Sequence, residues 1–156
     1  MAQAPDVHCI DSLEDFAEFA YAQGWTDGLP VFPPTRQAVE RMLAYVKRAP
    51  DEAIGKVFPA DHEATIQNIA ANCVMAGCIP EHLPVVLTAV QCIVDRAMPI
   101  TTTQSTGSAG IFTLVTGPVV KALDFHTREW IFGPKGGRAN AAIGRAVRLI
   151  LWNIGG

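Results

Sequence analysis

Hydrophobic residues recur three and four positions apart along most of the chain, as they do on the buried face of an amphipathic helix. Ser12 and Thr35 precede two of these segments in the position of an N-cap, and Gly24 and Gly77 follow two of them as helix stops. The pattern predicts helices at about residues 12–23, 36–47, 64–76, 80–96 and 139–152, and a short helix directly after residues 117–118.

The segment at about residues 80–96 is hydrophobic around nearly its whole circumference. A helix of this kind is buried, either in the core or between subunits. With the helix before it, the segment predicts a buried helical hairpin at about residues 64–96. The residues that produce the pattern are Val85, Val86, Leu87, Val90, Ile93 and Val94.

Two short runs, residues 54–58 and 111–115, have the composition of strands. No internal repeat and no change in composition divides the chain. We therefore expect one α+β domain over residues 1–156, with residues 1–11 as an arm and several helices around a small mixed sheet.

The composition excludes several classes of protein. Of the 156 residues, 49% are hydrophobic and 17% are charged, which is too apolar for a disordered chain. No uninterrupted apolar run has the length, about 18 residues, of a membrane-spanning helix. Residues 1–15 contain four acidic and no basic side chains, unlike a signal or transit peptide, so we expect a cytoplasmic protein.

Charge is distributed unevenly along the chain. Residues 1–100 hold 13 acidic and 6 basic side chains, whereas residues 101–156 hold 2 acidic and 6 basic ones. This asymmetry points to an anionic ligand or an acidic partner near the C-terminal third, and not to general nucleic-acid binding.

The spacing of cysteines and histidines does not indicate a metal centre. No CxxC pair and no HExxH motif is present, and no redox cofactor motif is visible. We therefore expect no metal site and no cofactor, and free thiols in a reducing compartment. The residues concerned are Cys9, Cys73, Cys78 and Cys92, and His8, His62, His82 and His126.

Cys78 is the first candidate for chemistry. It falls at or just before a predicted helix N-terminus, where free N–H groups and the helix dipole favour a thiolate. His82, one turn later, could pair with the thiol as in an activated nucleophile. The alternative is a small buried side chain at a helix junction, and packing is also the expected role of Cys73 and Cys92, which lie on apolar helix faces.

Asp27 is the second candidate. The sequence Asp-Gly-Leu-Pro around it predicts a turn, in which the carboxylate would bond its own backbone. Alternatively, Asp27 points into a pocket walled by Trp25 and transfers a proton.

A glycine-rich loop at residues 132–140 leads into the last helix and carries basic residues. A helix N-terminus with basic neighbours is suited to bind an anion, although the loop has neither the Walker nor the dinucleotide pattern. The alternative is a solvated turn, and the Thr/Ser run at residues 101–106 offers further hydroxyl donors. The expected substrate-binding residues of the loop are Lys135, Gly136, Gly137, Arg138 and Asn140.

Three segments, residues 24–35 (GWTDGLPVFPPT), 71–81 (ANCVMAGCIPE) and 132–140 (FGPKGGRAN) with the helix after it, resemble a bacterial family related to organomercurial (MerB-like) lyases. Its members occur beside, or fused to, UGSC-type (seleno)proteins. The resemblance covers about residues 20–156. It implies that Cys78 is the thiolate that captures a soft centre and that Asp27 is the best candidate for the acid.

This chain departs from the family in two places. Members continue past the Asn-Ile-Gly-Gly segment into a portion with another cysteine, and their loop reads Gly-Pro-Gly where this chain has Gly-Pro-Lys. The first departure implies that a second subunit completes the active site.

The sequence therefore predicts a subunit of a cysteine-dependent lyase or hydrolase that acts on a small, anionic organic substrate. Cys78 would be the nucleophile and Asp27 or His82 the proton shuttle. A non-catalytic structural or gating subunit of a heteromeric enzyme is the alternative, and a thiol carrier for sulfur or selenium is the third possibility. We expect a homo-oligomer or a heteromer, without nucleic-acid or membrane partners.

Overall fold

The computed structural model describes residues 8–95, 110–128 and 136–156. The α-helices are α1 (Leu13–Ala22), α2 (Arg36–Val46), α3 (Ile66–Met75), α4 (Leu83–Val94), α5 (Pro118–Ala122) and α6 (Arg138–Asn153). A 3-10 turn, η1 (Pro80–His82), leads into α4, and the described strands are β1 (Ala53–Val57) and β2 (His62–Thr65). The expected α+β class is confirmed.

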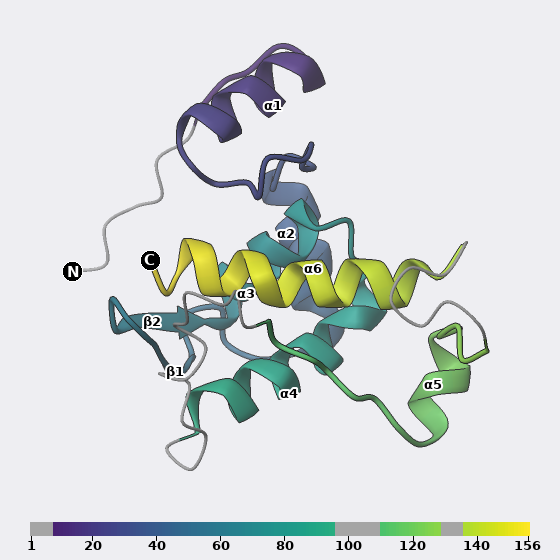
Figure 1. Ribbon diagram of the computed structural model, residues 1–156. Helices are drawn as coiled ribbons and strands as arrows, with labels where there is room; N and C mark the ends of the chain where they lie inside the picture. The colour runs from purple at the N-terminus through teal and green to yellow at the C-terminus, as the bar shows by residue number, and fades with distance from the viewer. Residues whose placement is uncertain (1–7, 96–109, 129–135) are drawn as a thin grey trace.

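Helices α3, α4 and α6 form the centre of the molecule (Figure 1). Small side chains on one face of α6, Ala139, Ala142 and Ala146, are buried and allow close packing. Each large apolar side chain buried here stabilises the fold by about 1.5–3 kcal/mol. The largest of these side chains include Ile66, Ile69, Leu83, Val86, Val90, Leu149 and Ile150.

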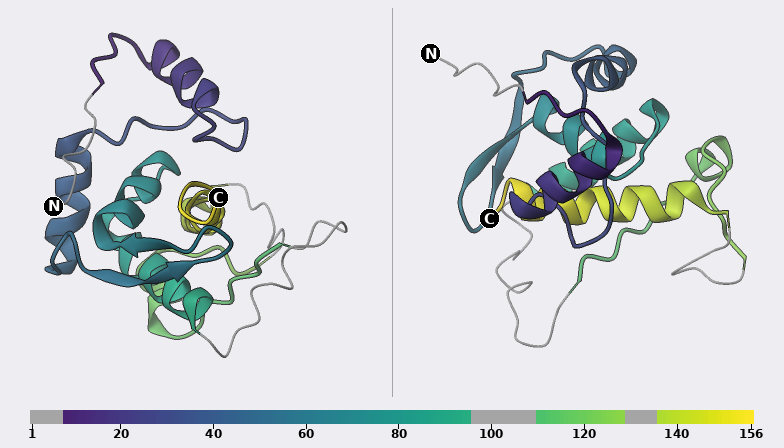
Figure 2. Two further views of the ribbon diagram at one scale, coloured as in Figure 1. Left: turned by 90° about the vertical axis from the view of Figure 1, so that its left-hand side faces the viewer. Right: turned by 90° about the horizontal axis from the view of Figure 1, so that it is seen from above.

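The sheet among the described residues is a two-stranded antiparallel hairpin, and not mixed as expected. Val57 lies opposite His62 at the closed end of the hairpin. The hairpin packs beside the helices (Figure 2), and β2 runs directly into α3. Residues 111–115 are not a strand: their odd-numbered side chains are partly buried, whereas Phe112 and Leu114 are exposed to solvent.

Only one face of α4 is buried, so the expectation of burial around its whole circumference is wrong. Its buried residues are spaced three and four apart, as in an ordinary amphipathic helix, while Val85 and Val94 are partly buried and four other positions are exposed. One consequence concerns Cys92, which was expected to pack in the interior and is instead exposed. The exposed positions of α4 are Pro84, Thr88, Gln91 and Cys92.

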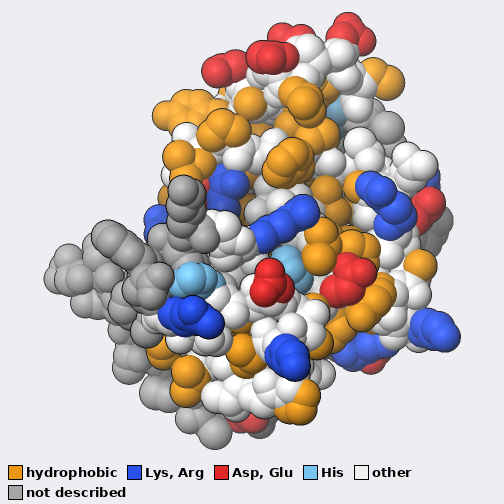
Figure 3. Space-filling view, turned by 90° about the vertical axis from the view of Figure 1, so that its right-hand side faces the viewer, with side chains coloured by type: hydrophobic (Ala, Val, Ile, Leu, Met, Phe, Trp, Pro, Cys, Tyr) orange, Lys and Arg blue, Asp and Glu red, His pale blue; other side chains and the backbone are white. Residues whose placement is uncertain are grey.

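Helix α1 lies at one end of the molecule, apart from the central helices (Figures 1 and 2). Acidic side chains gather at that end, and a band of hydrophobic side chains lies between it and the rest of the molecule (Figure 3). The C-terminal part of α6 holds the loop that follows α1. The indole N–H of Trp152 donates to the carbonyl of Gly24 at 2.8 Å, and the amide of Asn153 donates to the carbonyl of Trp25 at 3.1 Å.

The predicted N-caps are confirmed. The hydroxyl of Ser12 accepts a hydrogen bond from the N–H of Asp15, and that of Thr35 accepts one from Ala38. Such caps stabilise a helix by about 1 kcal/mol each. No described helix combines the length and the hydropathy needed to cross a membrane. The Thr/Ser run at residues 101–106 and the candidate Lys135 lie outside the described residues.

Helix α3 ends in a Schellman motif, in which a left-handed residue reverses the chain. Gly77 takes that position with φ +84° and donates its N–H to Val74. The N–H of Cys78 then reaches back to the carbonyl of Cys73 at 2.9 Å. In this motif the two residues joined by the longer bond commonly touch through their side chains. The turn therefore brings two cysteines together.

Gly77→Ala should destabilise the protein by about 1–2 kcal/mol, because a Cβ is unfavourable in the left-handed conformation. The added carbon would also lie 3.3 Å from the Phe32 ring. The matched control is Gly144→Ala in the middle of α6, where a Cβ would meet nothing within 4 Å. It should stabilise by about 0.5–1 kcal/mol. Urea unfolding measures both, and similar effects of the two substitutions would contradict the assignment of Gly77.

Candidate active site around Cys78

Cys78 lies beside a shallow groove of about 520 Å³. Gly77, the residue before Cys78, lines this groove, and so does Ala142. The Cys78 thiol donates a hydrogen bond at 3.4 Å to the carbonyl of Ala142. Cys78 is 8% exposed. The groove lies near the start of α6. Its lining residues are Phe32, Ala76, Gly77, Arg138, Ala141, Ala142 and Arg145.

The surroundings of Cys78 favour its thiolate. A hydrogen bond from the Cys73 thiol is the largest cause, followed by a hydrogen bond and charge from His82 and by the positive charge of Arg138. Burial and the bond to Ala142 favour the neutral thiol, but together the groups lower the pKa of Cys78 to about 6. The site therefore stabilises the thiolate of Cys78 more than the surroundings of an ordinary cysteine do.

Cys73 is the proton donor of this pair. Its hydrogen bond to Cys78 and its complete burial raise the pKa of the Cys73 thiol well above the usual range. The expected packing of Cys73 in the interior is confirmed, because it is completely buried in the core, but its pairing with Cys78 was not predicted. The sequence signal is present, because the two cysteines occupy the paired positions on either side of the helix-ending Gly77.

The expected source of the thiolate's stability is also corrected. The N–H of Cys78 donates to Cys73 at the C-terminal end of α3, so this group is already occupied. The next helical element, η1, has only three residues. Side-chain groups, and not a helix N-terminus, therefore lower the pKa of the thiol.

His82 is fully enclosed, with 1% of its surface exposed, and lies against Cys78. Its Nδ1 atom has no hydrogen-bond partner among the described residues. Buried polar atoms of this kind are uncommon and costly unless they serve a purpose. The geometry allows His82 to exchange a proton with the Cys78 sulfur.

Arg138, the first residue of α6, reaches across to the turn that carries Cys78. Its Nε and Nη2 atoms donate to the carbonyl of Gly77 at 3.0 and 2.8 Å. The guanidinium has five N–H donors, so others remain for a ligand. Gly136 and Gly137 lead into the helix, and Gly136 adopts φ +81°.

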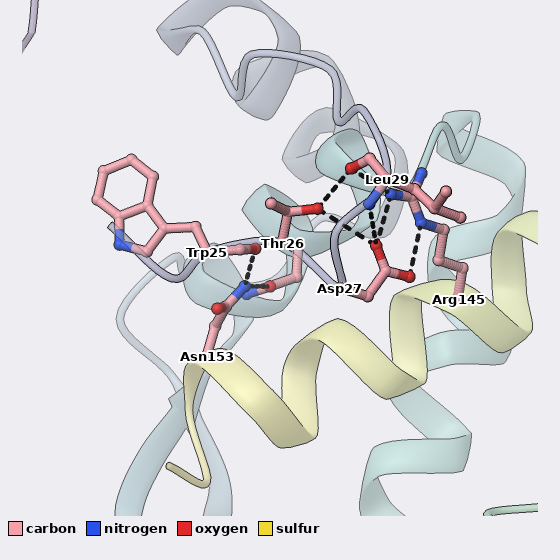
Figure 4. A network of polar contacts seen from close by, with 7 residues as sticks. Trp25, Thr26, Asp27, Leu29, Arg145 and Asn153 are labelled. Atoms are coloured by element: carbon pink, nitrogen blue, oxygen red, sulfur yellow. Dashed lines mark hydrogen bonds and ion pairs between the residues drawn. The ribbon is translucent and has the colours of Figure 1, made fainter. Parts of the chain in front are cut away.

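Asp27 is engaged in an ion pair (Figure 4). Arg145 donates to its two carboxylate oxygens at 2.9 and 3.3 Å and to the carbonyl of Leu29 at 3.1 Å. The bond from Arg145 lowers the pKa of the Asp27 carboxyl, with further bonds from Leu29 and Thr26 acting in the same direction. A carboxylate held ionised in this way is a poor proton donor, so the geometry favours the turn-stabilising role of Asp27.

Two further candidates have structural roles in this geometry. The Trp25 ring points away from Asp27 (Figure 4) and packs edge-on against Phe19, with ring centres 5.4 Å apart, so it does not form a wall around that carboxylate. The side-chain amide of Asn140 accepts from the N–H and donates to the carbonyl of His126, at 2.9 and 3.1 Å. Asn140 thereby fixes the segment after α5, and it lines a separate hollow of about 370 Å³.

Arg145 lies outside the motifs that the sequence singled out, and its role was not predicted. It lines the groove beside Cys78 and holds the carboxylate of Asp27, which is 118 positions away in sequence. Arg145 lies seven residues, or nearly two turns, after Arg138, and this spacing puts both side chains on the same face of α6. Among the described residues, no group of three or more His, Cys, Asp or Glu side chains is arranged to hold a metal ion.

Comparison of the chain with protein-family models, curated proteins and solved structures found no match. The resemblance to MerB-like lyases therefore stays a prediction from the three sequence motifs.

Replacing His82 by Gln should slow alkylation of Cys78 below neutral pH several-fold. The change removes a group that lowers the pKa of the thiol, so less thiolate is present at pH 6. At pH 9 the thiol is ionised in both proteins, and the rates should converge. Iodoacetamide labelling in a Cys9→Ser/Cys92→Ser background, followed by peptide mapping, measures this. If the variant and the unchanged protein are alkylated at equal rates at pH 6 as well as at pH 9, His82 does not affect the ionisation of Cys78.

Asp27→Asn should destabilise the protein by about 1–3 kcal/mol at neutral pH, because Arg145 loses a charged partner in a partly buried place. Since the folded-state pKa of Asp27 lies below its ordinary value of 3.8, this stability is present above that value and is lost as pH falls through the folded-state pKa. The acid-induced loss should therefore be smaller in the variant. Glu52→Gln, which breaks the exposed pair with Arg48, is the control and should change stability much less than Asp27→Asn does. Equal effects would contradict the structural role of Asp27.

Proposed function

We propose that this chain is a subunit of a cysteine-dependent lyase or hydrolase that cleaves a bond in a small, anionic organic substrate. The observation that carries the proposal is the position of the Cys78 thiol, which the turn after α3 holds beside a groove and next to groups that lower its pKa to about 6. A free cysteine at its ordinary pKa is mostly protonated at neutral pH and a much weaker nucleophile. Here the ionised form is available before a substrate arrives.

The anionic group of the substrate is assigned to the groove. Arg138 and Arg145 both line it, and of these two arginines only Arg145 forms an ion pair with a carboxylate of the described residues. A guanidinium binds a carboxylate through paired hydrogen bonds, which also fix its orientation. Phe32 and the small residues Ala76, Ala141 and Ala142 provide an apolar wall for the rest of the molecule.

In the proposed reaction the sulfur of Cys78 attacks the electrophilic centre and the bond to the leaving group breaks. His82 is assigned the proton transfer to the leaving group, because it contacts the thiol and Asp27 is occupied by Arg145. If the substrate is an organometal, as the family resemblance implies, the thiolate captures the soft metal and the carbon receives the proton.

The test uses two carboxylate-bearing probes: mono-4-nitrophenyl succinate for the hydrolase and 4-(hydroxymercuri)benzoate for the lyase. Either release of nitrophenolate with an acyl group on Cys78, or release of benzoate, supports the proposal. Cys78→Ser should abolish the release while the fold remains intact, and Cys92→Ser, at an exposed cysteine, should leave it unchanged. Activity that survives in Cys78→Ser, or no Cys78-dependent product from either probe, would overturn the proposal.

Arg138 gives a second readout in the same assay. Arg138→Lys keeps the charge and loses the planar pair of donors, so the KM for the succinate ester should rise by about tenfold with a smaller change in kcat. The neutral ester 4-nitrophenyl acetate is the control, and its kinetics should hardly change. An equal effect on both esters would mean that Arg138 only supports the Gly77 turn.

The expected assembly with a second subunit stays a proposal. The large side chains of Leu29 and Phe32 are 60% and 59% exposed, and Phe32 also lines the groove. Apolar surface beside a binding groove favours contact with a further chain. Light scattering of the purified chain measures this, and a monomer at all concentrations would contradict a homo-oligomer.

A further inference from the structure

Cys73 and Cys78 are held in contact by the main chain itself. The 2.9 Å hydrogen bond from the N–H of Cys78 to the carbonyl of Cys73 joins their backbones and places the two side chains at the touching positions of a Schellman motif. Cys73 is completely buried, whereas Cys78 is 8% exposed beside the groove. A small reagent from solvent therefore meets Cys78 first.

We propose that Cys73 and Cys78 form an oxidisable dithiol, in which a peroxide oxidises Cys78 and Cys73 then closes an intramolecular disulfide. The inference rests on the turn that places the two cysteines at paired positions, and it does not require the lyase or hydrolase activity. If that activity exists, the disulfide blocks it reversibly, because the nucleophilic sulfur is consumed.

The first step forms a sulfenic acid. The thiolate of Cys78 attacks one oxygen of the peroxide, the O–O bond breaks, and the sulfur keeps that oxygen as a sulfenic acid. The other oxygen leaves with the electron pair of the broken bond and takes a proton, forming water or an alcohol. Cys78 is thereby oxidised by two electrons and the peroxide is reduced by two. His82, in contact with the thiol, can deliver a proton to the leaving oxygen.

The second step uses the buried thiol. Cys73 loses its proton and its sulfur attacks that of Cys78; the S–O bond breaks and the oxygen leaves as water after protonation. In the reduced protein Cys73 holds its proton because it donates to the neighbouring thiolate. Once Cys78 is a sulfenic acid, no thiolate accepts this hydrogen bond, and Cys73 can lose its proton. A dithiol reductant returns both residues to thiols by exchange.

The structure offers two observations that favour this order. The two remaining cysteines, Cys9 and Cys92, are exposed and lie outside the turn that joins Cys73 to Cys78. The buried position of Cys73 also protects it from direct attack, so it acts only after Cys78 has reacted.

The test uses the Cys9→Ser/Cys92→Ser protein, which retains both core cysteines. After treatment with one equivalent of hydrogen peroxide, its mass should fall by two hydrogens, peptide mapping without reductant should find Cys73 linked to Cys78, and dithiothreitol should reverse the change. Unchanged thiols, or oxidation only to higher acids of Cys78, would overturn the proposal. This measurement needs no substitution in the core.

Two further variants in that background separate the roles of the sulfurs. Cys73→Ala should accumulate a sulfenic acid on Cys78 that dimedone traps, and Cys78→Ser should consume peroxide more slowly by at least about tenfold. Peroxide consumption by Cys78→Ser at the original rate would contradict the order. Turnover of the nitrophenyl or mercuribenzoate probe is measured separately on the reduced protein, so failure of disulfide formation and failure of the proposed function are distinguishable.

Discussion

The hydrogen bond from the N–H of Cys78 to the carbonyl of Cys73 is the constraint on which the candidate site depends. It closes the last turn of α3 over Gly77 and brings two thiols into one small space. In that space the proton of one thiol stabilises the negative charge of the other, since both are shielded from water. The low pKa of Cys78 is thus a consequence of how a helix ends, combined with which residues stand on either side of the glycine.

One face of helix α6 provides the other contacts that hold the candidate site together. Arg138 binds the carbonyl of Gly77, Ala142 accepts from the Cys78 thiol, and Arg145 holds the turn at Asp27. These residues are four and three positions apart, the spacing that aligns side chains along one side of a helix. At its C-terminal end, Asn153 joins Asn72 of α3 at 2.7 Å. Displacing α6 would therefore disturb the thiol, the groove and the turn together.

The sequence predicted the helices and their caps because these depend on local spacing. Cap residues such as Ser12 and Thr35, and the periodicity of α3, act within a few positions. Strand β2 was missed because residues 62–65 include a single buried hydrophobic residue, Ala64, and the strand is defined by its pairing with β1. Short polar strands carry little periodic signal.

The candidate site was predicted in part. Cys78, His82 and Arg138 come together around the turn, and two of them were placed there by their nearness in sequence. The pairing of Asp27 with Arg145 depends on the packing of α6, which no local pattern reports. The pairing of Cys73 with Cys78 could have been predicted from the sequence. Cys73 lies four residues before the helix-ending Gly77 and Cys78 lies directly after it, and these are the two positions that touch in a Schellman motif.

The central claim is that contact with Cys73 makes Cys78 a thiolate at neutral pH. The most direct measurement follows the ultraviolet absorbance of the thiolate as pH rises, in a chain that retains only the two core cysteines. The account predicts a first ionisation with a midpoint near the pKa of about 6, and an upward shift of that midpoint when Cys73 is replaced by Ala. A first ionisation at the ordinary pKa of a thiol, unchanged by that replacement, would contradict it.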